Sequence, residues 1–135
     1  MFDEPSVSLP LAELKHQMQD VEKLLPENDG ARKWFRPGSG FFSKEMLGVV
    51  EGMGYRMALG SVYPHDATIP SARINAGHVL GMVREGAVVI VHDRRSYSVD
   101  EIGRILKGLE DGGWRVESLG GLLKVAEEEN VKKGG

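Results

Sequence analysis

The stretch VVIVHDRRSY, residues 88–97, places four aliphatic residues directly before a histidine, an aspartate and two arginines. An uninterrupted aliphatic run is typical of a strand covered on both faces, as the strands of parallel sheets are. Ligand sites of parallel α/β folds lie at the carboxyl ends of the strands. A histidine at that position is well placed for proton transfer near neutral pH. The stretch therefore predicts a parallel sheet with a functional His92 at its edge.

Helical and extended segments alternate along the rest of the chain. Apolar residues at three- and four-residue steps predict a first helix over residues 11–25. Further helices are expected over residues 44–54, 72–84, 99–113 and 120–133, with caps at Ser43 and near Ser98. Strands are expected over residues 32–37, 55–62, 86–93 and 114–119. Strands joined by helices pair in parallel through right-handed crossovers, so we expect an α/β fold with about four parallel strands in an open arc.

Composition narrows the function classes. The 135 residues, 41% of them hydrophobic, suffice for one compact domain. A net charge of -3 and the lack of any Lys/Arg cluster longer than a pair argue against a nucleic-acid partner. No cysteine is present, which excludes disulfides and thiolate metal sites but leaves the cellular compartment open. The sequence has neither a secretory signal pattern nor an apolar run of about 20 residues that would span a membrane.

The loop FRPGSG, residues 35–40, follows the first expected strand and has two interpretations. It is either a surface turn with a solvated Arg36 or a binding loop in which Pro37 holds this arginine rigidly. In the second case Gly38 and Gly40 let backbone N–H groups approach a substrate oxygen.

The four histidines differ in their expected roles. His65, beside Asp66 on a polar loop, is typical of plain surface, whereas His92 follows a buried strand and is favoured as a proton donor or acceptor. His16 and His78 fall within expected helices, where solvated or packed histidines are common. No HxxxH or HExxH spacing occurs, so we expect no self-contained metal site.

Four segments occur in a suggestive order: WFRPGSGFF (34–42), LGSVYPHD (59–66), VVIVHDRRS (88–96) and GGWRVESLGGLL (112–123). Together they resemble the motifs of the polysaccharide deacetylase family (NodB homology, carbohydrate esterase family 4), especially its chitin deacetylase-like members. The resemblance implies the C-terminal portion of a distorted (β/α) barrel, with residues 1–128 as a partial domain and 129–135 as a charged disordered tail. It also implies a hydrolase that uses zinc or another divalent metal to remove acetyl groups from chitin, peptidoglycan or xylan.

The resemblance assigns three catalytic roles. Arg36 falls on the arginine that orients the catalytic base in this family. Asp66 falls on the aspartate that sets the charge state of the catalytic histidine, and His92 falls on that histidine, the general acid that protonates the leaving amine. An Asp66 carboxylate close to His92 would favour the charged imidazolium by direct attraction.

Substrate-binding roles follow from the same resemblance. Pro37 and Gly38 belong to one wall of the substrate groove, Tyr63 to the next motif, and Ile90 to the pocket for the acetyl methyl group. Two departures make the groove less complete: Gly38 and Ser39 replace the usual proline and aromatic residue, and Ala67 replaces the usual tryptophan.

The Thr-Phe-Asp-Asp and His-x-x-x-His motifs, which supply the base and the metal ligands of the family, are absent. We therefore expect the chain to begin in mid-domain and to be inactive alone, with no metal site of its own. It is then either part of a chitin-like polysaccharide deacetylase or a non-catalytic descendant that binds a glycan or a protein. In either case an exposed barrel edge would favour self-association.

Overall fold

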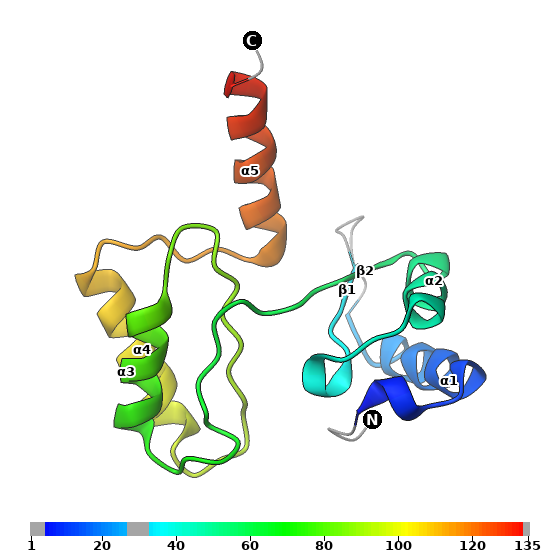
Figure 1. The fold of residues 1–135 in the computed structure, drawn as a ribbon, viewed down its shortest axis with the longest axis horizontal. Helices are drawn as coiled ribbons and strands as arrows, with labels where there is room; N and C mark the ends of the chain where they lie inside the picture. The colour runs from blue at the N-terminus through cyan, green and yellow to red at the C-terminus, as the bar shows by residue number, and fades with distance from the viewer. Residues whose placement is uncertain (1–4, 27–32, 134–135) are drawn as a thin grey trace. The chain divides into compact units, whose positions relative to one another are not determined.

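The computed structural model describes residues 5–26 and 33–133, which form two compact units that divide between Leu59 and Gly60 (Figure 1). One compact domain was the expectation. The described residues form a two-stranded parallel sheet and one isolated parallel bridge, where a sheet of about four strands was expected. Each unit is therefore described by itself.

The first unit contains a small parallel sheet. Its elements in chain order are η1 (Ser6–Ser8), α1 (Leu11–Glu22), β1 (Lys33–Phe35), η2 (Gly38–Gly40), α2 (Lys44–Gly52) and β2 (Tyr55–Met57). Strand β1 pairs with β2 in parallel, and Phe35 lies opposite Met57. Its core is made by the buried side chains of Leu14, Met18, Phe35, Met46, Val50 and Tyr55. Ser43 caps α2 as expected, because its side chain accepts a hydrogen bond from the Met46 N–H at 3.2 Å.

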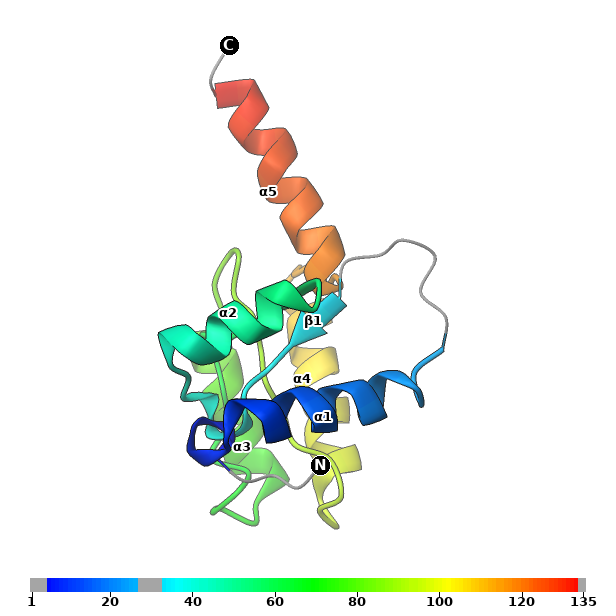
Figure 2. The ribbon, with the colours of Figure 1, turned by 90° about the vertical axis from the view of Figure 1, so that its right-hand side faces the viewer.

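The second unit is mostly helical. It contains α3 (Ala72–Met82), α4 (Ser98–Asp111) and α5 (Leu119–Lys133). Helices α3 and α4 lie side by side (Figure 1 and Figure 2). The core of this unit consists of the buried side chains of Val62, Ala76, Val79, Ile105 and Leu109. The Val62 and Val89 segments pair through an isolated parallel bridge.

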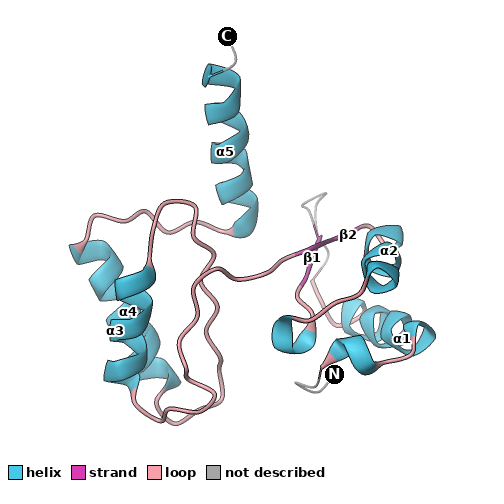
Figure 3. Cartoon of the chain, in the orientation of Figure 1, coloured by secondary structure: helices cyan, strands magenta, loops and turns pink. Residues whose placement is uncertain are grey.

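The five expected helices are all present in the described residues, whereas two of the four expected strands are not (Figure 3). Residues 86–93 make only the bridge at Val89. Residues 114–118 are exposed and form no strand, and Trp114 and Val116 are 39% and 59% exposed. The physical reason is that a strand exists only where a neighbour takes up its backbone N–H and C=O groups. Residue 32, the expected start of the first strand, lies outside the described residues.

Several helix boundaries also differ from expectation, since α1, α2, α3 and α4 each end two or three residues earlier than the sequence pattern predicts. Ser98 is the first residue of α4 rather than its cap, which is Tyr97. Helix α5 ends at Lys133, where the apolar pattern over residues 120–133 places its end, and residues 129–133, which the family resemblance assigned to a tail, belong to this helix; residues 134–135 lie outside the described part. Across the described residues, the helices are too short or too polar to span a lipid bilayer.

The packing of α3 against α4 can be tested at two glycines of α4. Gly103→Ala is expected to stabilise the chain by about 1 kcal/mol, because an added Cβ meets no atom and alanine favours the helix. A Cβ at Gly108 would lie 2.3 Å from Leu80 Cδ1, so Gly108→Ala should be less stable than Gly103→Ala by about 1–3 kcal/mol. Urea unfolding of the two variants measures the difference. Equal stabilities would contradict this close approach.

Candidate functional site

The pairing of two extended segments brings two sequence-distant loops together in the second unit. The Ile90 N–H donates to the Val62 carbonyl oxygen at 2.9 Å, which fixes the register of these segments. In parallel pairing both segments leave in the same direction. Asp66 and His92 therefore emerge at the same edge, four residues after Val62 and three after Val89.

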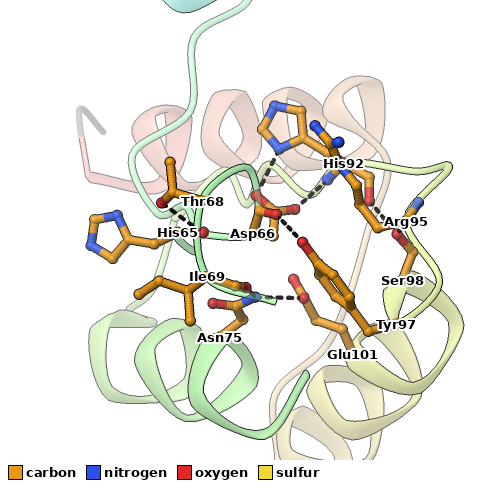
Figure 4. Close-up of polar contacts among 10 residues, drawn as sticks. All are labelled: His65, Asp66, Thr68, Ile69, Asn75, His92, Arg95, Tyr97, Ser98 and Glu101. Atoms are coloured by element: carbon orange, nitrogen blue, oxygen red, sulfur yellow. Dashed lines mark hydrogen bonds and ion pairs between the residues drawn. The ribbon is translucent and has the colours of Figure 1, made fainter. Parts of the chain in front are cut away.

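The Asp66 carboxylate binds His92 at two places (Figure 4). The His92 backbone N–H donates to Asp66 Oδ2 at 2.7 Å, and His92 Nδ1 lies 2.7 Å from Asp66 Oδ1. The Asp66 side chain is 1% exposed and the His92 side chain 27%. Because a carboxylate only accepts hydrogen bonds, Nδ1 carries a proton in this pair. That leaves Nε2 as the ring nitrogen able to exchange a proton with a ligand.

The first turn of α4 holds both loops in place. The Tyr97 hydroxyl donates to the Asp66 carbonyl oxygen. The Ser98 hydroxyl donates to the His92 carbonyl oxygen at 3.0 Å and accepts from the Arg95 N–H at 3.2 Å. The N-cap residue and the first residue of α4 thus fix the main chain at both members of the Asp66–His92 pair.

A second buried carboxyl group lies beneath this pair. Glu101 of α4 is 2% exposed, and its Oε2 accepts a hydrogen bond from Asn75 Nδ2 of α3 at 2.9 Å. Asn75 Nδ2 also donates to the Ile69 carbonyl oxygen at 2.9 Å. Burial raises the pKa of the Glu101 carboxyl above its usual range; the Asn75 hydrogen bond opposes the rise and the nearby Asp66 adds to it.

Sequence reasoning missed Tyr97, Asn75 and Glu101 as members of this cluster. A weak signal was available for two of them. Glu101 shares a helix face with Ile105 and Leu109 at four-residue steps, and Asn75 shares one with Val79. A polar residue on an apolar stripe indicates a buried polar contact, although it does not identify the partner.

The Arg36 loop belongs to the first unit. Arg36 is exposed directly after β1, and Pro37 is buried. The Gly38 N–H donates to Ser6 Oγ at 2.8 Å, and the Gly40 N–H donates to the Pro37 carbonyl oxygen at 3.0 Å. Both amides that were expected to approach a substrate oxygen are thus hydrogen-bonded within the chain, and the substrate-binding roles of Pro37 and Gly38 stay predictions. The role of Arg36 toward a catalytic base stays a prediction.

The two remaining substrate-binding candidates lie in the second unit. Tyr63 is half exposed, and its ring meets the edge of the His65 ring with the centroids 6.4 Å apart. Ile90 packs against Gly60 so closely that a Cβ there would lie 2.4 Å from Ile90 Cδ1. These contacts place both side chains but do not test their substrate-binding roles.

The family's reaction uses a divalent metal, so the His, Asp and Glu side chains of the described residues can be checked for a set that would bind one. Zinc is bound by three or four His, Cys or carboxylate side chains that converge on one point. Within residues 5–26 and 33–133, no three such side chains group together. Asp66 and His92 are already bound to each other through the ring nitrogen nearest the carboxylate. The described residues therefore do not fit a metal site.

Removing the charge of Asp66 tests the site directly. Asp66→Asn keeps the shape but replaces one of the two carboxylate oxygens with an NH2 group, so one of the two His92 donors loses its acceptor and we expect a loss of about 1–3 kcal/mol of unfolding free energy. Asp93→Asn is the matched control, because Asp93 is 86% exposed, and should change stability by less than about 0.5 kcal/mol. Chemical denaturation measures both. Equal effects would show that the Asp66–His92 contact contributes nothing.

No protein-family model and no curated protein matches the sequence. Solved structures do match. The peptidoglycan deacetylase PdaC from Bacillus subtilis is 23% identical with a TM-score of 0.85, and the match covers 97% of this chain and 64% of that structure. The chitin deacetylase from Colletotrichum lindemuthianum is 18% identical with a TM-score of 0.74, over 89% of this chain and 57% of that structure.

A third match is a family 4 carbohydrate esterase pseudoenzyme from Bacillus anthracis, at 20% identity and a TM-score of 0.77. It covers 90% of this chain and 43% of that structure. The chain thus spans less than two thirds of the length of each of these three structures. At these identities the likeness concerns the fold. Over the part that it spans, the chain has the α/β fold of the family 4 carbohydrate esterases, as its motifs predicted.

Proposed function

We propose that this chain is the C-terminal part of a polysaccharide deacetylase in which His92 is the general acid and Asp66 orients it. One observation carries the proposal. A buried carboxylate binds both the backbone N–H and the ring Nδ1 of a partly exposed histidine, on a fold shared with deacetylases. The substrate class proposed is an N-acetylated glycan related to chitin or peptidoglycan.

Proton transfer is the step that the described residues support. When the amide C–N bond of an N-acetyl sugar breaks, the leaving nitrogen must gain a proton. His92 Nε2 is the donor in this proposal, and its N–H bond breaks as the amine N–H bond forms. The Asp66 carboxylate holds the ring through Nδ1, at 2.7 Å, so that Nε2 is the nitrogen left to donate the proton. General acid catalysis of this kind contributes about 10²- to 10⁴-fold.

The described residues do not supply the catalytic base or the metal ligands that the reaction needs. We propose that both belong to a part of the deacetylase that this chain lacks, which includes the Thr-Phe-Asp-Asp and His-x-x-x-His motifs. The chain alone is then inactive. Association with that missing part, or with a second copy, would occur through backbone groups that an incomplete barrel leaves without a partner strand.

A second candidate is a non-catalytic descendant that binds a glycan or a protein partner. The observation that favours it is the match to a pseudoenzyme of the same fold. The DNA upstream of the Met1 codon distinguishes the two. An in-frame or spliceable Thr-Phe-Asp-Asp and His-x-x-x-His supports the deacetylase, and their absence supports the binding protein.

Acetate release from N-acetylglucosamine oligomers tests the proposal. The 135-residue chain with added zinc should release none, and turnover by the pure chain would contradict the claim of inactivity. If the upstream frame encodes the missing motifs, the extended protein should be active. His92→Ala should then lower kcat by about 10²- to 10⁴-fold, whereas Asp93→Ala should leave it unchanged. Full activity of His92→Ala would exclude the acid role.

A further inference from the structure

We infer that Glu101 is a neutral carboxylic acid at neutral pH and that, in this state, it positions the Asp66–His92 pair. Two buried carboxyl groups lie close together in the second unit, and their surroundings differ (Figure 4). Where two neighbouring carboxyls have different environments, the environments decide which one carries the charge.

Asp66 is equipped to carry a charge. Its two oxygens face two donors of His92, the backbone N–H and ring Nδ1, each at 2.7 Å. Hydrogen bonds to a carboxylate stabilise its ionised form, and a histidine ring that can become cationic stabilises it further.

Glu101 is not equipped in this way. It has one uncharged donor, the Asn75 amide, at Oε2, and its buried Oε1 has no hydrogen-bond partner among the described residues. A buried charge without partners costs far more than an unpaired neutral group. The neutral acid, which leaves only an O–H unpaired, is therefore the form that this site favours.

Taken together, the groups that face Glu101 also favour its neutral form. Burial and the charge of Asp66 raise the pKa of the Glu101 carboxyl, while the Asn75 hydrogen bond and His92 lower it. The third titratable group here is Tyr97, whose hydroxyl is bonded to the Asp66 carbonyl oxygen. A second carboxylate beside Asp66 would meet like-charge repulsion in the interior, so a single negative charge remains for His92.

A structural link joins Glu101 to the catalytic candidates. Glu101 holds the Asn75 amide, which in turn holds the Ile69 carbonyl oxygen, and Ile69 lies three residues after Asp66 in the same loop. The His65 carbonyl oxygen accepts from the Ile69 N–H at 2.7 Å, so this loop is closed on itself. Glu101 therefore acts through Asn75 as a positioning residue.

The protonation state is measurable by NMR without any deacetylase activity, so its outcome is separate from that of the proposed function. In the full chain labelled at glutamate carboxyl carbons, the Glu101 signal should keep the chemical shift of a protonated acid at about pH 7. The exposed Glu110 of the same helix should have the shift of a carboxylate. Glu101→Gln and Glu110→Gln assign the two signals by their loss.

Two outcomes would overturn the neutral acid. One is a Glu101 signal that titrates together with Glu110. The other is a Glu101→Gln chain that fails to fold, because an uncharged isostere should be accepted where a neutral acid stands. Glu110→Gln is the matched control for the charge change on an exposed face of α4.

The positioning role has its own measurement. The ring-nitrogen chemical shifts of His92 report which nitrogen carries the proton. Glu101→Gln should leave these shifts in place, because the amide oxygen still accepts from Asn75. Asn75→Ala, which cuts the link to Ile69, should move them toward the shifts of the exposed His16. Unchanged His92 shifts in a folded Asn75→Ala chain would rule the positioning role out.

Discussion

The contact between the Asp66 carboxylate and His92 is the interaction on which the second unit depends. A carboxylate that is 1% exposed must find donors inside the protein, and here both come from one residue. The hydrogen bond from the backbone N–H fixes the distance between the two loops. The contact between the carboxylate and Nδ1 keeps the ring in the tautomer that carries a proton on Nδ1. In the proposed function, the contact that satisfies this buried carboxylate also orients the histidine for proton transfer.

The N-terminal turn of α4 carries the supports of this contact. Tyr97 and Ser98 bind the carbonyl oxygens of Asp66 and His92, and Glu101, one turn further, reaches Asn75 of α3. The packing of α3 against α4 keeps these groups in register, with Leu80 filling the space above Gly108. The contacts that stabilise the helix pair are therefore also the contacts that hold the site in its geometry.

Fold and catalytic competence are separate matters in this architecture. Structures that share the fold include deacetylases and a pseudoenzyme. The proposed acid of the present chain is supported by hydrogen bonds to its loops, whereas the described residues do not offer the donors that a metal needs. The proposal of a partial deacetylase accounts for both facts, because a site assembled from several strand ends can be divided between segments of a chain.

The sequence by itself determined the helices, because apolar residues at three- and four-residue steps act locally and a cap such as Ser43 lies beside the helix that it begins. Motif order also singled out Asp66 and His92. Only the tertiary structure decided that Ser98 serves the His92 loop and that Glu101 lies inside, since both depend on which segment packs above them. It also decided that residues 114–118 form no strand, because strand pairing requires a neighbour that no local pattern can supply.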